Sequence, residues 1–359
     1  MVDLVDLRIQ VQTNCQISDA RHWGMYSICG LILRFRSFYR WLEGIKPWEE
    51  PDMEQIMSWI DDSERLWRAV ETEDFHDINV GGKSFSPFDL KGINRELGDT
   101  CYVYGAGYAG GLKPTFFLAE VVDIQKISDI DVYYLGKELA RDLDAYPAMS
   151  QDGKIYARRE PMGHFLYDKI VELGNTGKMS IKDALETYNF NPFKFKDESE
   201  IGHKLNEISW AELEIYVYHE IGEVKEPFFK DNRWHGIIQV FSNTRVEKLA
   251  RAIGDIMADT NDFGMLNHII RYQKRASLGF YVAFIDGFRK LMFPEILEAY
   301  QKFMETGDWK VIEEARIKGH EKAEEYGGRI LDIYDSAISK GRDFAVMEIT
   351  RELITPLGV

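Results

Sequence analysis

Residues 210–223 read Trp210-Ala211-Glu212-Leu213-Glu214-Ile215-Tyr216-Val217-Tyr218-His219-Glu220-Ile221-Gly222-Glu223. Apolar residues recur in this stretch at the spacing of an amphipathic helix. They would form one line along the helix: Trp210, Leu213, Val217, Ile221 and, just beyond, Val224. A mostly acidic line would run on roughly the opposite side: Glu212, Tyr216, His219, Glu223 and Glu226. The stretch therefore predicts a helix that packs by one side into a bundle and carries ionisable groups on the other.

The polar line contains the pattern H-E-x-x-E. His219 and Glu223 are four residues apart, so both side chains project from the same helix face. In zinc-peptidase helices the glutamate after the first histidine acts as general base, and Glu220 has that position. Glu223 stands where those helices carry a second histidine. We therefore expect His219 and Glu223 to be metal ligands and Glu220 to be catalytic. The alternative is an ordinary solvated acidic helix face.

A second helix is predicted over residues 263–292, with an apolar centre at 279–285. On its helical wheel His268 is in line with Asp286. If this line faces the acidic line across a polar seam, His268 becomes a further metal ligand, as in bundles that build metal sites from inward-facing carboxylates and histidines. Zinc suits a mixed His/Glu set, whereas iron or manganese suits a set richer in carboxylates. The alternative is that Asp286 is buried in an ion pair with an arginine.

Between these two helices, charged residues recur every four positions: Glu247, Arg251, Asp255 and Asp259. This spacing is typical of a ladder of ion pairs on an exposed helix face. We therefore expect these residues to be solvated and to take no part in a site.

The first half of the chain predicts helices together with a small antiparallel sheet. Period-2 alternation predicts a strand at 7–11, and helices are expected from residue 18 or 19 to 41 and over 53–70. Further strands are expected at 101–104, 115–122, 132–135 and 154–159, with a helix at 137–143.

From residue 200 onward only helical patterns remain. They predict helices over 200–226, 232–242, 245–259, 263–292, 295–305, 308–339 and 343–354. Asparagine and proline punctuate residues 189–197, which we interpret as a linker. The predicted fold class is α+β: an N-terminal helical domain with a small antiparallel sheet over 1–190, followed by an all-α helical-bundle domain over 200–359.

The glycines of residues 105–110 satisfy the pattern G-x-G-x-x-G. A dinucleotide site needs a helix directly after these glycines, so that amide groups and the helix dipole meet the pyrophosphate. Here Lys113, Pro114 and a β-branched, aromatic run follow, which favours a hairpin. We expect no nucleotide cofactor.

The net charge of −16 disfavours binding to nucleic acid or to an anionic membrane surface. The three cysteines, Cys15, Cys29 and Cys101, are far apart and indicate a reducing compartment with no disulfide framework. The acidic first residues lack the features of a signal peptide, and the longest apolar stretches are too short to span a bilayer. We expect a cytoplasmic protein.

Four runs carry a resemblance to a known family: Cys15-Gln16-Ile17-Ser18-Asp19-Ala20, His219-Glu220-Ile221-Gly222-Glu223, Asp259-Thr260-Asn261-Asp262 and Ser277-Leu278-Gly279-Phe280-Tyr281. Through them the chain resembles an uncharacterised bacterial protein family, over most of its length. No activity is attached to that family. The resemblance therefore implies a natural architecture and transfers no catalytic residue.

These patterns together favour a soluble metal-dependent enzyme that hydrolyses a small-molecule substrate, with zinc, iron or manganese as the metal. Its ligands would be His219, Glu223 and His268. Glu220 would take a proton from water, which needs a metal ion to be acidic enough near neutral pH. Two alternatives stay open. One is a non-catalytic helical protein that docks on a protein partner or on itself, and the other is a small-ligand binder at the domain junction.

Overall fold

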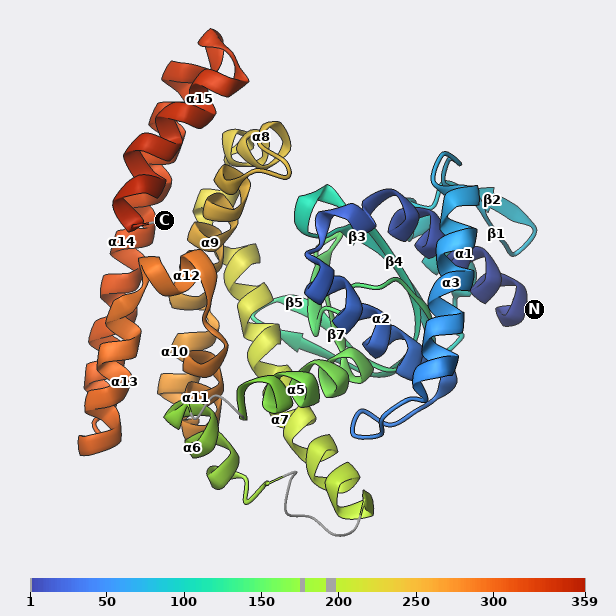
Figure 1. The fold of residues 1–359 in the computed structure, drawn as a ribbon, viewed down its shortest axis with the longest axis horizontal. Coiled ribbons are helices and arrows are strands. Elements are labelled where there is room, and N and C mark those ends of the chain that lie inside the picture. Colours follow the sequence, from blue (N-terminus) through green and yellow to red (C-terminus); the bar gives the residue numbers. More distant parts are fainter. Residues whose placement is uncertain (1, 175–177, 192–197, 359) are drawn as a thin grey trace. The chain divides into compact units, whose positions relative to one another are not determined.

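The computed structural model describes residues 2–174, 178–191 and 198–358. The chain divides into an N-terminal unit, Met1–Asp168, and a C-terminal unit, Lys169–Val359. Its fold is mixed α+β, and every strand of the described residues lies in the N-terminal unit (Figure 1). Most of the predicted linker at 189–197 lies outside the described residues. No helix among the described residues combines the length and the apolar character needed to cross a membrane.

The N-terminal unit combines helices with two sheets. Its helices are α1 (Leu4–His22), α2 (Ile28–Glu43), α3 (Met53–Val70) and α4 (Leu90–Leu97), and α5 (Arg159–Gly174) crosses into the C-terminal unit. Its strands are β1 (Ile78–Val80), β2 (Lys83–Phe85), β3 (Tyr102–Tyr108), β4 (Pro114–Ile127), β5 (Ile130–Arg141), β6 (Ala148–Gln151) and β7 (Lys154–Arg158). The predicted helix at 53–70 has the bounds of α3.

The main sheet has five strands in the order β3-β4-β5-β7-β6. All neighbours are antiparallel except β5 and β7, so the sheet is mixed and the expectation of an antiparallel sheet is only partly confirmed. The turn at Asp152 and Gly153, both with positive φ, makes β6 and β7 a hairpin whose second strand pairs with β5 in parallel. The helix predicted at 137–143 is wrong, because β5 continues to Arg141 in register with β4.

The strand predicted at 7–11 is also wrong, because these residues lie in α1. Asp3 caps this helix by accepting hydrogen bonds from the backbone N–H groups of residues 5 and 6. Leu7, Val11 and Cys15 are buried at four-residue spacing, whereas Ile9 is 57 % exposed. This helical spacing decides the structure, since α1 buries that face against β4 and β5.

The glycine run lies in the β3–β4 hairpin, as the sequence predicts. Gly105 pairs with Phe117 across the two strands. A Cβ atom on Gly105 would lie 2.1 Å from the Phe117 ring. The glycine is therefore required by ring packing in the sheet, which accounts for it without a phosphate group.

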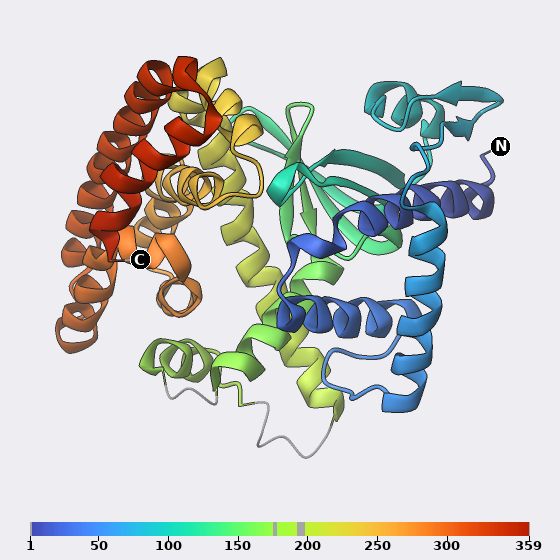
Figure 2. The same ribbon diagram turned by 45° about the horizontal axis from the view of Figure 1, so that its top comes forward.

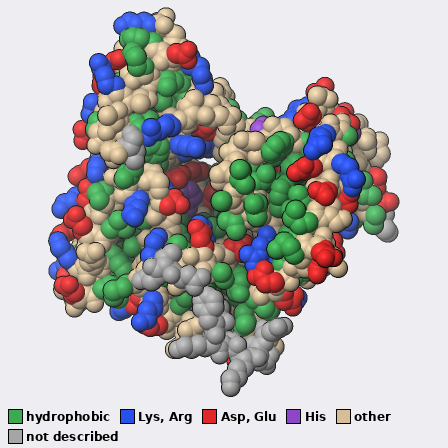
Figure 3. All heavy atoms as spheres, in the orientation of Figure 1, with side chains coloured by type: hydrophobic (Ala, Val, Ile, Leu, Met, Phe, Trp, Pro, Cys, Tyr) green, Lys and Arg blue, Asp and Glu red, His purple; other side chains and the backbone are tan. Residues whose placement is uncertain are grey.

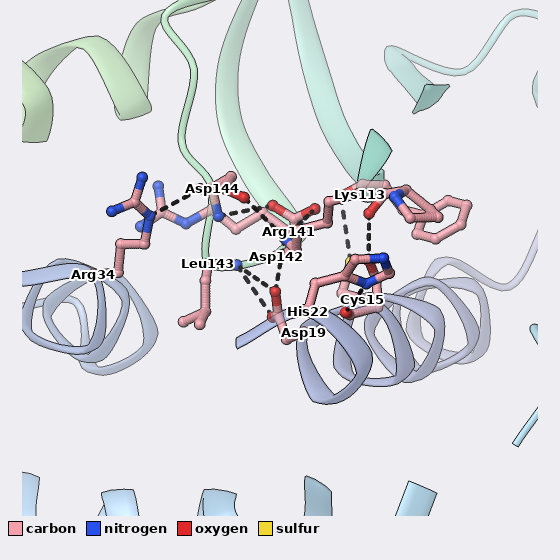
Figure 4. A network of polar contacts seen from close by, with 12 residues as sticks. Cys15, Asp19, His22, Arg34, Lys113, Arg141, Asp142, Leu143 and Asp144 are labelled. Carbon is pink, nitrogen blue, oxygen red and sulfur yellow. Dashed lines mark hydrogen bonds and ion pairs between the residues drawn. The ribbon is translucent and has the colours of Figure 1, made fainter. Parts of the chain in front are cut away.

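A buried ion network ties the N-terminal unit together around Lys113 (Figure 4). The Lys113 Nζ lies 2.8 Å from Asp19, 3.4 Å from Asp142 and 3.1 Å from Asp144, and none of these side chains is more than 3 % exposed. Asp19 comes from α1, Lys113 precedes β4, and the other two carboxylates follow β5. The network therefore connects three segments that are distant in the sequence. Arg34 of α2 adds a second cation, 2.9 Å from Asp144.

Helix α2 leaves several large apolar side chains exposed, and hydrophobic side chains gather over it in Figure 3. They include Ile28, which is 79 % exposed, Ile32 and Leu33. The other side of α2 is buried, where Phe35 and Phe38 contact Trp59 and Trp67 of α3. Aromatic packing between α2 and α3 therefore fills that side.

The C-terminal unit is helical throughout its described residues. Its helices are α6 (Met179–Thr187), α7 (Glu198–Lys225), α8 (Asn232–Val240), α9 (Arg245–Thr260), α10 (Met265–Arg271), α11 (Arg275–Phe284), α12 (Gly287–Met292), α13 (Pro294–Thr306), α14 (Trp309–Ala337) and α15 (Arg342–Ile349). Helix α15 folds back along α14 (Figures 1 and 2). Most of the helices predicted from the sequence begin and end close to these observed bounds.

The predicted helix at 263–292 is wrong, because the segment forms α10, α11 and α12. Gln273 and Gly287 have φ values of +50° and +51°, which no α-helix contains. Asp286 lies just before α12 and is exposed, so it is neither buried nor in line with His268. The chain turns at these two points and thereby brings α12 beside α9.

Helix α9 is the central helix of this unit, and most of its residues are buried. It crosses α7 at a very short distance. A Cβ atom on Gly222 of α7 would lie 2.1 Å from the carbonyl oxygen of Ala258 in α9. Only glycine allows this approach, and the side-chain amide of Asn261 donates a 3.0 Å hydrogen bond to the Gly222 carbonyl at the same crossing.

Replacing Lys113 by methionine is expected to lower the free energy of unfolding by about 3–5 kcal/mol, because three buried carboxylates would lose their shared cation. Lys91→Met is the matched control, since Lys91 pairs with Asp152 at the surface and its side chain is 80 % exposed. Its effect should stay within about 0.5 kcal/mol. Urea unfolding followed by tryptophan fluorescence measures the stability of both variants. Equal unfolding midpoints for Lys113→Met and Lys91→Met would contradict the structural role of the network.

Replacing Gly222 by alanine is expected to destabilise the protein by about 1–3 kcal/mol, because the added carbon would collide with the α9 backbone. Gly328→Ala in α14 is the control, since nothing lies within 4 Å of a Cβ atom there. That variant should gain up to about 1 kcal/mol from the higher helix propensity of alanine. Urea unfolding followed by far-ultraviolet circular dichroism compares the two, and a Gly222→Ala protein as stable as Gly328→Ala would show that the crossing tolerates a wider spacing.

Candidate metal centre

The acidic line of α7 passes from the interior of the C-terminal unit toward its surface. Glu212 is 3 % exposed and accepts hydrogen bonds from the hydroxyl groups of Tyr188 and Ser277. Further along, the His219 side chain is 17 % exposed and the Glu223 side chain 37 %. The helix therefore holds His219 and Glu223 where the bundle opens to solvent, with the buried end of the line behind them.

Helix α9 supplies two further carboxylates to the same place. Its residues Asp255 and Asp259 are four apart, so they share one face of the helix. The close crossing at Gly222 brings that face against His219. The His219 Nδ1 atom lies 2.7 Å from Asp259 Oδ1, and the Asp259 side chain is fully buried.

The Asp259 contact fixes the orientation of the imidazole ring. With Nδ1 occupied by Asp259, Nε2 is left to face Glu223, whose Oε1 lies 3.7 Å away. Ligand atoms of His219, Glu223 and Asp255 all lie within 4.8 Å of one another. A carboxylate that holds one imidazole nitrogen while the other faces a ligand set is the arrangement found around histidine-bound metals.

Burial and mutual repulsion shift the protonation of these groups. Burial, with the Glu220 charge, raises the pKa of Glu223 to about 8. Burial also raises the pKa of Asp255, although Arg289 opposes it. For His219 burial lowers the pKa, but the Asp259 carboxylate outweighs it and the pKa rises to about 10. The carboxyl groups of Glu223, Asp255 and Asp259 thus meet around one imidazole, and a divalent metal ion bound between them would relieve their mutual repulsion.

Glu220 is buried at 9 % exposure, and its charge acts on Glu223. It lies one residue after His219 and three before Glu223, so it borders the ligand set without belonging to the group of three. From this position the Glu220 carboxylate could accept a proton at the edge of the site.

His268 lies elsewhere in the C-terminal unit. Its ring stacks on Tyr218 at a centroid distance of 3.7 Å, and its Nε2 lies 3.5 Å from Glu214. Tyr218 and Glu214 are on a different side of α7 from the acidic line. Because the predicted long helix is broken, α10 places His268 there, and the structure does not bring it together with His219 and Glu223.

Sequence reasoning missed Asp255 and Asp259. The charged ladder of α9 was expected to be exposed, but Asp259 is fully buried and Glu247 is 3 % exposed. The Glu247–Arg251 part of the ladder does form an ion pair, at 2.7 Å. One sequence signal could have indicated these two residues as site candidates. They are four residues apart, which is the same spacing as His219 and Glu223 on the facing helix.

The Lys113 network is a second buried charged cluster, but its chemistry differs. Burial alone would lower the pKa of Lys113, whereas Asp142, Asp19 and Asp144 together raise it well above its usual range. The amine therefore stays protonated and is no nucleophile. Because Lys113 contacts all three carboxylates and Arg34 adds a second cation, we interpret this network as structural.

Comparisons with known proteins give a family and no activity. No curated protein and no solved structure matches the chain. The resemblance to a family without assigned activity is confirmed. Residues 6–158 match the N-terminal domain and residues 163–352 the C-terminal domain of a family of unknown function, DUF6866, and the chain belongs to this family.

Proposed function

We propose that the C-terminal unit binds a divalent metal ion through His219 Nε2, Glu223 and Asp255, and that the protein is a metal-dependent hydrolase. The observation that carries the proposal is the 2.7 Å contact of Asp259 with His219 Nδ1, which turns Nε2 toward the two other ligands. His268 is left out of the ligand set because it lies beside Glu214.

The donor set supports a metal of borderline to hard character. One imidazole nitrogen and two carboxylates suit zinc, iron or manganese, and the second carboxylate favours the latter two. Three protein ligands leave coordination positions open, which is typical of catalytic metal sites. A bound metal ion would make water acidic enough to lose a proton near neutral pH. Glu220 is the carboxylate we assign to accept that proton.

The proposed substrate is a small molecule, and the proposed location is the cytoplasm. Cys15, Cys29 and Cys101 are all free in the structure. Free cysteines, one of them buried beside Phe116, are compatible with a reducing compartment.

Elemental analysis and titration with Mn²⁺ or Zn²⁺ test the ligand set. The wild-type protein is expected to bind one equivalent, and His219→Ala and Glu223→Ala should bind at least about tenfold more weakly, because each removes a ligand. His235→Ala and His268→Ala are controls that remove a histidine of the same unit outside the group of three. Wild-type affinity in His219→Ala, or its loss in His268→Ala, would reject the assignment.

Metal affinity is expected to rise with pH between about 6 and 8.5. The pKa values of about 8 for Glu223 and about 10 for His219 mean that His219 holds a proton throughout this range and Glu223 up to about pH 8, and a metal ion must displace these protons. The gain should be about tenfold per pH unit for each proton displaced. Calorimetry in buffers of different ionisation enthalpy counts these protons. Binding without proton release at pH 7 would contradict the predicted protonation of the site.

A further inference from the structure

A pocket of about 620 Å³ lies in the C-terminal unit, and its volume is in the range of small-molecule sites. Side chains at and after the ends of α7 and α9 line it together with side chains of α14. None of the proposed metal ligands, His219, Glu223 and Asp255, belongs to this lining. The pocket is therefore a second place in this unit for a small ligand.

Two helices end at this pocket, and their ends favour positive charge. Helix α7 ends at Lys225, and α9 ends at Thr260, directly before the lining residues 261–263. The C-terminus of a helix carries a partial negative charge, which stabilises a cation placed beside it. A ligand with a cationic group therefore suits this end of the unit.

Most charged side chains of the lining already have partners. Arg233 pairs with Asp231, and Arg316 contacts Asp262 at 3.5 Å. The buried Glu226 carboxylate accepts hydrogen bonds from two N–H groups. These five side chains shape the pocket, and other lining groups are left to select what enters it.

Two acceptors face each other on α14. The Thr260 hydroxyl donates to the backbone carbonyl of Ile256, so its oxygen accepts a hydrogen bond from His320 Nδ1, 3.1 Å away. In the neutral ring Nε2 then carries a lone pair, and it lies 3.7 Å from the Glu324 carboxylate. A donor between these two atoms would satisfy both. An ammonium group supplies three N–H donors and the cation that the helix ends favour.

Lys225 provides the opposite charge. Its ammonium lies 5.8 Å from the centre of the Phe263 ring and forms no ion pair with a described carboxylate. A carboxylate on the ligand would give this lysine a charge-assisted partner. Phe228, Phe263 and Leu331 add apolar surface to the same pocket. The pocket thus combines an acceptor pair, an unpaired lysine and apolar walls.

We infer that this pocket binds a free amino acid with a large apolar side chain. The ammonium group of the ligand donates to His320 Nε2 and Glu324, and its carboxylate pairs with Lys225. Its side chain packs against Phe228 and Phe263. This binding needs no metal ion, so the inference is independent of the proposed metal site.

Saturation-transfer NMR and calorimetry of the full chain with L-phenylalanine test the pocket, in buffer with EDTA so that no metal takes part. The wild-type protein is expected to bind L-phenylalanine. N-acetyl-L-phenylalanine, which lacks the ammonium group, should bind at least about tenfold more weakly. 2-Phenylethylamine, which lacks the carboxylate, should bind severalfold more weakly, and glycine, which lacks the apolar side chain, should show no saturation transfer.

Two variants assign these preferences to residues. Glu324→Gln should weaken the binding of both L-phenylalanine and 2-phenylethylamine. Lys225→Met should weaken only L-phenylalanine, so the preference of the wild type for the amino acid over the amine should disappear. A lost preference with retained amine binding cannot result from unfolding. Glu321→Gln and Lys248→Met are the controls, since both side chains are exposed and lie outside the lining.

Each outcome decides one part of the inference. Absence of saturation transfer to L-phenylalanine, or equal binding of its N-acetyl derivative, would overturn the ammonium site. Equal affinity of the wild type for L-phenylalanine and 2-phenylethylamine would overturn the pairing with Lys225, and an amino acid would no longer be the ligand. Wild-type binding in both Glu324→Gln and Lys225→Met would overturn the assignment to this pocket. Because EDTA is present throughout, none of these results bears on the metal site.

Discussion

The close crossing of α7 and α9 is the constraint on which the candidate site depends. Because Gly222 has no side chain, the backbone of α7 can approach the Ala258 carbonyl of α9. Each helix contributes one pair of ionisable residues at four-residue spacing, and the crossing sets these pairs face to face. The buried Asp259 carboxylate then reaches His219 at 2.7 Å. A larger residue at position 222 would separate the helices, and a shift of about 1 Å is enough to disorder a ligand set of this kind.

The two units differ in how their buried charged groups are compensated. In the N-terminal unit, Lys113 and Arg34 compensate carboxylates from three segments, and burial holds the pKa of Asp19 near 7, so the network can reach neutrality internally. In the C-terminal unit, Glu223 and Asp255 lie close to the His219–Asp259 pair, and the pKa of Glu223 rises to about 8. The first arrangement is complete without a ligand and holds segments together. The second gathers further acids around one imidazole at a place that solvent can reach.

Helix positions could largely be read from the sequence because apolar periodicity and capping residues are local signals. Short local patterns gave a wrong prediction at the N-terminus. The alternation at residues 7–11 covers only five residues, whereas the four-residue spacing of Leu7, Val11 and Cys15 is the pattern of the buried face of α1. His219, Glu220 and Glu223 could be named because they share one helix. Asp255 and Asp259 looked like a solvated ladder, since burial of one helix face depends on which neighbour covers it. The Lys113 network, joining residues 19, 113 and 142–144, has no sequence pattern at all.

A purely structural role for His219 would be satisfied by Asp259 alone. Imidazolium and carboxylate at 2.7 Å form a complete ion pair, and such a pair needs nothing at Nε2. Instead, Glu223 lies 3.7 Å from Nε2 and Asp255 has an oxygen within the same 4.8 Å group, although burial and like charges raise the pKa of both carboxyl groups. Bringing further acids to a nitrogen that is already compensated costs stability. A divalent cation bound between them would offset this cost, which is the physical argument for the proposed metal site.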